Sequence, residues 1–134
     1  MANLSPEMIE MVKSVKTFPL ATASKDGEPN VVPVGALFVM DPETIWIGNQ
    51  FMKATVENLR ENPKACLYVW GPEAKGCLKI KGEVTVQSSG ADYERMKDMV
   101  KARRADLVCK ALLVFKVTAV YNCKSGPDAG KQLV

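Results

Sequence analysis

The sequence contains no histidine among its 134 residues. This absence excludes Ser-His-Asp triads, Cys-His nucleophile pairs, histidine-ligated zinc and a haem held by a proximal histidine. It also excludes a histidine general base. Any chemistry must therefore come from carboxylates, lysine, tyrosine, cysteine or a bound cofactor.

Charge, cysteine spacing and hydrophobic runs exclude further classes. With 18 Lys and Arg against 15 Asp and Glu, the net charge is +3, which is too small to indicate nucleic-acid binding. The four cysteines form no Cys-x-x-Cys pair and no metal-ligand spacing, so we expect reduced cysteines and no metal site. No apolar run approaches the roughly 18 residues of a membrane span, and residues 1–6 lack the features of a signal peptide. We therefore expect a cytoplasmic protein with neither a nucleic-acid nor a membrane partner.

The chain length predicts one domain over residues 1–134, and the sequence pattern predicts a mainly β fold with peripheral helices. Ser5 before Pro6 predicts the start of an N-terminal helix within residues 1–16. Further helices are expected over residues 55–62 and after Ser89, which has an acidic residue three positions on. Six strands are expected, over residues 18–23, 29–39, 44–48, 65–70, 77–87 and 112–121, followed by a loosely ordered tail over 122–134. Antiparallel strands in this number favour a small barrel, which has few exposed sheet edges.

Residues 31–35, Val-Val-Pro-Val-Gly, are unusual for a strand. Pro33 removes a backbone N–H that a central strand would use, and Gly35 removes a side chain. Two interpretations stay open. The segment is either an edge strand with a bulge, or a backbone that a ligand approaches closely.

Residues 49–55 form the second unusual segment. A strand end, a loop with amide side chains, a lysine and a hydroxyl residue precede a predicted helix. The helix dipole and its free N–H groups favour a phosphate, Lys53 adds a positive charge, and Thr55 can donate its hydroxyl. The alternative is a plain N-cap by Thr55 beside a solvated Lys53.

These two segments resemble the pyridoxamine 5′-phosphate oxidase-like family, whose members are FMN-binding split barrels. The likeness rests on Leu20–Ala23 with Asp26–Gly35, followed by Ile47–Pro63, and elsewhere on strand order. It implies a six-stranded antiparallel split β-barrel that forms a homodimer with FMN at the subunit interface. The strand positions are implied to line the flavin and ribityl chain by backbone, and the loop to receive the phosphate: Val32, Pro33, Val34, Gly35, Asn49, Gln50, Phe51, Met52, Lys53, Ala54 and Thr55. Trp70 is expected either to stack near the flavin or to pack at the barrel end.

The resemblance also implies an oxidoreductase that passes hydride or electrons through FMN to a small acceptor, with a nicotinamide or redox-protein donor. No residue stands out as a catalytic acid or base, and Arg103 is expected in a solvated helix end. The sequence lacks the arginine-rich phosphate loop of true pyridoxamine-phosphate oxidases, and their C-terminal arginine and histidine have no counterpart after Tyr121. That particular oxidase activity is therefore not expected. A non-catalytic FMN carrier and a deazaflavin-using reductase stay open as alternatives, whereas haem is disfavoured because there is no histidine.

Overall fold

The computed structural model describes residues 2–72 and 74–134. Their elements, in chain order, are α1 (Pro6–Lys13), β1 (Phe18–Ala23), β2 (Pro29–Val34), β3 (Leu37–Asp41), β4 (Thr44–Asn49), α2 (Ala54–Glu61), β5 (Lys64–Trp70), β6 (Cys77–Gln87), α3 (Ala91–Arg103) and β7 (Ala111–Asn122). The sequence predicted six strands, but the described residues form seven. The prediction of one strand over 29–39 is wrong because the chain breaks at Gly35 and Ala36 into β2 and β3.

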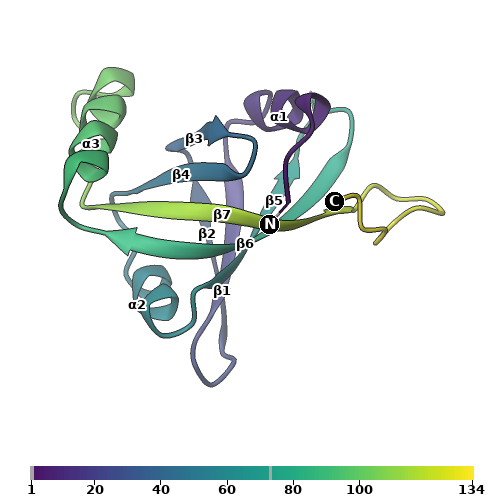
Figure 1. The fold of residues 1–134 in the computed structure, drawn as a ribbon, viewed down its shortest axis with the longest axis horizontal. Coiled ribbons are helices and arrows are strands. Elements are labelled where there is room, and N and C mark those ends of the chain that lie inside the picture. The colour runs from purple at the N-terminus through teal and green to yellow at the C-terminus, as the bar shows by residue number, and fades with distance from the viewer. Residues whose placement is uncertain (1, 73) are drawn as a thin grey trace.

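The sheet is antiparallel, with strand order β2-β1-β5-β6-β7-β4-β3. Its two edge strands, β2 and β3, are consecutive in the chain and are joined by only two residues. Because three Cα–Cα steps reach about 11 Å at most, the sheet has to curl until its two edges approach each other at this link. Figure 1 shows the resulting curled sheet. The predicted split-barrel class is confirmed.

The inner face of the curled sheet holds the main core. Its most buried side chains come from β1, β4, β5, β6 and β7, and include Leu20, Ile45, Ile47, Leu67, Ile80, Leu113 and Phe115. A second cluster lies beneath α3, where Met96 and Val100 pack against Trp46 and Leu112. The small hydrophobic core under α3 holds that helix against β4 and β7.

The N-terminal helix begins as predicted. Ser5 is the N-cap, and its hydroxyl accepts the Met8 backbone N–H at 3.2 Å, while Pro6 occupies the first helical position. The predicted Ser89 cap is wrong, since α3 begins at Ala91 after Gly90, whose φ is 100°, and has no side-chain cap. No helix in the described part of the chain is long and apolar enough to span a membrane.

The C-terminal tail differs from the prediction. Instead of being loosely ordered, residues 122–134 fold back along the end of β7. The Leu133 N–H donates to the Val120 carbonyl at 2.7 Å, and the Asn122 N–H donates to the Lys131 carbonyl at 2.9 Å. These backbone hydrogen bonds do not depend on side-chain type, so the sequence carried no signal for them.

Candidate functional site

The two unusual sequence segments meet at one cavity of about 230 Å³. Its lining residues come from the end of β2, the end of β4 and the loop after β4: Val32, Pro33, Val34, Gly35, Gly48, Gln50, Phe51 and Met52. All of these except Gly48 were predicted to bind a cofactor. The Gly48 N–H donates to the Ala36 carbonyl at 2.9 Å, which ties the β2–β3 link to β4. The cavity therefore lies where the two edges of the sheet approach each other.

Because Gly35 has no side chain, a ligand in this cavity can approach the backbone closely. It does not have a positive φ, so its backbone conformation does not require glycine. A Cβ built on it would meet no atom within 4 Å, so packing within the chain does not require glycine either. The residue is exposed and lines the cavity. Open space beside a strand-end backbone is what a ligand that contacts the main chain needs.

Gln50 places an unpartnered polar group at the cavity. Its side-chain Nε2 is buried and has no hydrogen-bond partner among the described residues. An unsatisfied buried donor costs about 1–3 kcal/mol, so an acceptor on a bound molecule would stabilise this side chain. Phe51, at the cavity rim, has 81% of its surface exposed.

Asn49 shapes the loop rather than lining the cavity. It is buried, and its Oδ1 accepts the Met52 N–H at 2.7 Å while its Nδ2 donates to the Met52 carbonyl at 3.4 Å. The Asn49 carbonyl accepts the Lys110 N–H at 2.7 Å. These bonds hold residues 50–52 in a compact loop at the end of β4.

The helix α2 begins directly after this loop. Lys53 is its N-cap residue, exposed and without a side-chain cap, and Ala54 is its first helical residue. The predicted alternative of a Thr55 N-cap is wrong. Since no capping side chain covers this end, the backbone N–H groups at Ala54, Thr55 and Val56 find no acceptor among the described residues. Among the described residues, the N-terminus of α2 therefore combines unpaired backbone N–H donors with the positive charge of Lys53.

The Thr55 side chain docks α2 onto the sheet. It has 1% of its surface exposed, and its hydroxyl accepts the Asn30 Nδ2 at 3.0 Å. The same Asn30 amide donates to the Thr22 hydroxyl at 3.2 Å, which also accepts the Asn58 Nδ2 at 3.1 Å. The sequence predicted that Thr55 donates its hydroxyl to a phosphate, whereas the structure buries this hydroxyl against Asn30. Only its backbone N–H faces the uncapped end.

Trp70 lies apart from the Gly35 cavity within one chain. Its side chain has 60% of its surface exposed at the end of β5. It lines a different cavity, of about 500 Å³, together with Tyr68, Cys77 and Cys123. The structure thus brings most predicted site residues together and leaves Trp70 outside.

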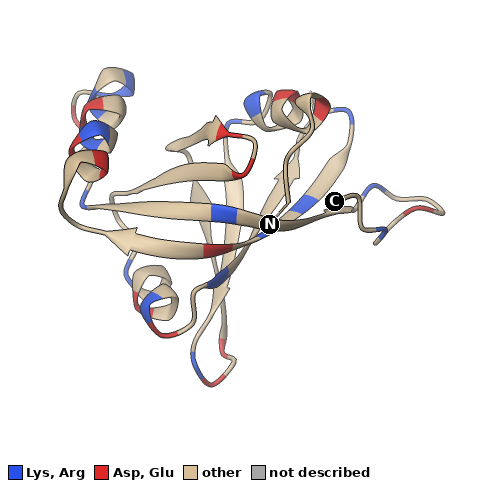
Figure 2. Cartoon of the chain, viewed as in Figure 1, with Lys and Arg blue, Asp and Glu red and all other residues tan. Residues whose placement is uncertain are grey.

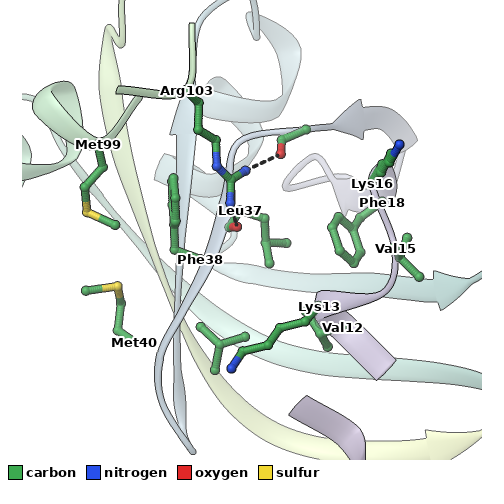
Figure 3. Close-up of a pocket in the computed structure, with 12 residues that line it drawn as sticks. Val12, Lys13, Val15, Lys16, Phe18, Leu37, Phe38, Met40, Met99 and Arg103 are labelled. Atoms are coloured by element: carbon green, nitrogen blue, oxygen red, sulfur yellow. Dashed lines mark hydrogen bonds between the residues drawn. The ribbon is translucent and has the colours of Figure 1, made fainter. Parts of the chain in front are cut away.

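A second cavity, of about 530 Å³, adjoins the first, and Gly35 lines both. Arg103, from the end of α3, is one of the residues that line it (Figure 3). The guanidinium group lies 4.1 Å from the Phe38 ring centroid and donates to the carbonyl oxygens of Gly35 at 3.3 Å and Leu37 at 3.5 Å. Arg103 is exposed at the helix end, as expected, but its guanidinium also contacts Phe38 and the β2–β3 link, which the sequence did not predict. Lys13 and Lys16 also line this cavity, which has no acidic residue among its described lining.

The Gly35 cavity itself is electrically neutral. None of the described side chains that line it is titratable, and the charged residues lie mostly on the helices and connecting loops (Figure 2). The nearby Cys109 is buried next to the Asn49 strand end, and burial raises the pKa of its thiol. It therefore stays protonated at neutral pH, and the cavity offers no side-chain acid or base within one chain.

Sequence reasoning missed three residues that shape the site. Gly48 carried a signal, because a glycine inside a strand marks close packing. A Cβ there would lie 3.0 Å from the Met96 methyl and 3.2 Å from the Gln50 amide nitrogen. Asn30 and Arg103 carried no signal, since their partners lie far away in sequence.

A curled antiparallel sheet whose edges meet at a short link, with a cavity at that meeting point, defines a split-barrel protein. A family model described as pyridoxamine 5′-phosphate oxidase matches residues 4–124. An uncharacterised protein of Methanocaldococcus jannaschii is 37% identical over 131 residues, covering 96% of this chain and 87% of the relative. The chain belongs to the pyridoxamine 5′-phosphate oxidase family.

Solved structures with the same fold differ in what their names say they bind. HupZ of Group A Streptococcus superimposes with a TM-score of 0.81 at 25% identity, covering 95% of this chain and 99% of that one. An FMN-binding protein from Syntrophomonas wolfei gives 0.67 at 20% identity, over 84% of this chain and 80% of that one. An F420 reductase gives 0.61 at 24% identity, over 87% and 98% of the two chains. The haem storage protein HutZ of Vibrio cholerae gives 0.68 at 18% identity, over 90% and 95%.

Proposed function

We propose that this protein binds FMN in the Gly35 cavity and passes electrons through it to a small acceptor. Family membership supports flavin as the cofactor class, and a structural neighbour is named as an FMN-binding protein. The observation that carries the proposal is Gly35. Neither its φ nor its packing requires glycine, and it faces the space that a ligand in contact with the backbone would fill.

The residues around the cavity fit the parts of FMN. The exposed backbone at Gly35 accommodates a flat ring, and the buried Gln50 Nε2 has a hydrogen to donate. Lys53 and the free N–H groups at the start of α2 suit the phosphate. Bound FMN supplies reversible hydride and single-electron chemistry. The chain's own part is to position the cofactor and to keep the cavity free of titratable side chains.

One chain encloses too little space for the whole cofactor. Ligand cavities usually measure about 300–1,000 Å³, whereas this one measures about 230 Å³. Phe51 at its rim is exposed, and Val31, which precedes the lining residue Val32 in β2, has 63% of its surface exposed. We therefore propose a homodimer in which a second copy covers the cavity. A partner also gives the exposed Trp70 a route to a flavin held by the other subunit.

The electron donor or acceptor binds, in this proposal, in the Arg103 cavity. Gly35 lines both cavities, so a molecule in the second lies next to a cofactor in the first. Arg103 and Lys13 favour an anionic group, and Phe38 with Met40 offers an apolar surface. A nicotinamide dinucleotide phosphate has both features.

The test of FMN binding is a titration of the purified protein, followed by flavin fluorescence and by sedimentation. We expect a dimer that quenches and binds FMN, and Lys53→Ala should weaken binding by one to two decades, since a charge-assisted contact is worth about 1.5–3 kcal/mol. Lys25→Ala is the matched control, because Lys25 is exposed in the β1–β2 turn away from the cavity. A wild-type protein that ignores saturating FMN refutes the proposal.

A turnover assay separates the enzyme from its alternatives. NAD(P)H consumption by the FMN-loaded protein is measured with quinones, nitro-compounds and free flavin as acceptors. Arg103→Gln should lower turnover while Arg104→Gln, whose guanidinium pairs with Asp106 on the surface, should leave it unchanged. Flavin that is reduced only through a protein partner indicates a carrier. A deazaflavin released from protein purified from its native host, identified by mass spectrometry, would replace FMN in the proposal.

A further inference from the structure

Cys77 and Cys123 face each other across two neighbouring strands. The β6–β7 register pairs Leu78 with Asn122, so the next pair outward is Cys77 with Cys123. The Cys123 N–H donates to the Cys77 carbonyl at 2.9 Å, which fixes this pairing. Both cysteines are free thiols.

This placement suits a disulfide. Hydrogen-bonded residues directly opposite each other in an antiparallel pair have Cα atoms about 5.5 Å apart and side chains on the same face. Disulfides are found with Cα separations of about 4.4–6.8 Å. Cys123 lies one residue beyond the end of β7, where the backbone has freedom for the small adjustment that bond formation needs.

The pair is reachable from solvent through a cavity of about 500 Å³ that both cysteines line. Cys77 is buried and Cys123 is half-buried, so Cys123 is the thiol that an incoming reagent meets first. Lys75 and Lys124 line the same cavity, and no acidic residue does so within the described part of the chain. The positive charges of these two lysines therefore attract an anionic reagent to the cavity.

We propose that Cys77 and Cys123 are a redox-active thiol pair that a small anionic disulfide oxidises reversibly to an intrachain disulfide. The Cys123 thiolate attacks one sulfur of the reagent, forming a mixed disulfide and releasing one thiol. Cys77 then loses its proton and attacks the Cys123 sulfur, which releases the second thiol. The two cysteines lose two electrons and two protons, and the reagent disulfide becomes two thiols.

Burial, followed by the neighbouring Cys77, raises the pKa of Cys123. The Cys123 thiol is therefore mostly protonated at neutral pH and reacts slowly. This separates it from a catalytic thiol, whose pKa is lowered. The disulfide would join β6 to the segment that leads into the folded-back tail. It would also restrict movement in the cavity that Tyr68 and Trp70 line with the two cysteines.

The test uses the full-length reduced protein, equilibrated with oxidised and reduced glutathione, then alkylated and digested with trypsin. We expect alkylation to fall from four thiols to two, and a linked species of peptides Gly76–Lys79 and Val117–Lys124 that dithiothreitol separates. Cys66→Ser should keep the link, because Cys66 lies on β5 outside this cavity. Cys123→Ser should abolish it.

Three outcomes overturn the proposal. They are a glutathione adduct on Cys123 without the linked peptides, a link that joins Cys66 instead of Cys77, and four alkylated thiols at every glutathione ratio. The wild-type digest decides between these outcomes without any variant, so a variant that fails to fold leaves the test intact.

Discussion

Replacing Gly35 with alanine is expected to raise the stability of the fold and to lower its affinity for FMN, so the two effects can be measured separately. In the chain alone, a Cβ at this position meets no atom within 4 Å, and the backbone φ is not positive. Alanine at such a site reduces the freedom of the unfolded chain and stabilises by about 0.4–1 kcal/mol. For a chain of this length, that corresponds to a rise in Tm of about 1–5 °C.

The effect of Gly35→Ala on FMN is expected to have the opposite sign. A methyl group inserted into a filled contact costs about 1–3 kcal/mol, so Kd should rise about 5- to 150-fold. The apo protein is followed by circular dichroism during heating, and the affinity by quenching of flavin fluorescence. Gly71→Ala is the control, because a Cβ there makes only an ordinary 3.7 Å contact with Val15, away from the Gly35 cavity. An FMN affinity within twofold of wild type, or a Tm several degrees lower, refutes the reasoning.

Three other changes test the surroundings of the cavity. Gly48→Ala should lower Tm, since a Cβ there lies 3.0 Å from an α3 side chain and overpacking costs about 1–3 kcal/mol; an unchanged Tm contradicts this. Thr55→Val should cost about 1–2 kcal/mol in urea unfolding, because Asn30 loses a buried acceptor; an unchanged midpoint refutes the docking role. Burial alone raises the pKa of Asp41, but hydrogen bonds, first that from the Glu43 N–H, outweigh it and lower the pKa below 3.8. Its stabilisation is thus present above pH 4 and lost below, so unfolding free energies of wild type and Asp41→Asn should converge in acid; a constant gap is the contrary result.

Local patterns predicted most elements of this fold. Ser5 with Pro6 located the start of α1, and alternating apolar residues located the strands, because these signals act within a few residues. The break between β2 and β3 was missed, since Val31–Val39 is apolar on both sides of Gly35 and reads as one strand. What divides it is the curl of the whole sheet, which no short window of sequence contains.

In the candidate site too, local sequence patterns predicted some features, and others depend on contacts made only in the folded chain. The loop after β4 and the end of β2 were singled out separately, and the fold brings them to one cavity. The role of Thr55 was misjudged because its burial depends on Asn30, a neighbour only in three dimensions. Arg103 is exposed, as expected, but its contact with Phe38 was missed for the same reason, because the two meet only after α3 packs on the sheet.

The two-residue link between β2 and β3 also has a consequence for the order of folding. It joins strands that are adjacent in the chain but stand at opposite ends of the hydrogen-bonded ladder. The cavity beside it exists only after every intervening strand has found its register, so a partly folded chain has no cavity to fill. A ligand held there binds the native state alone and adds RT ln(1 + [L]/Kd) to its stability. Cofactor uptake then reports completed folding, and slow release of the cofactor would delay unfolding of the entire sheet.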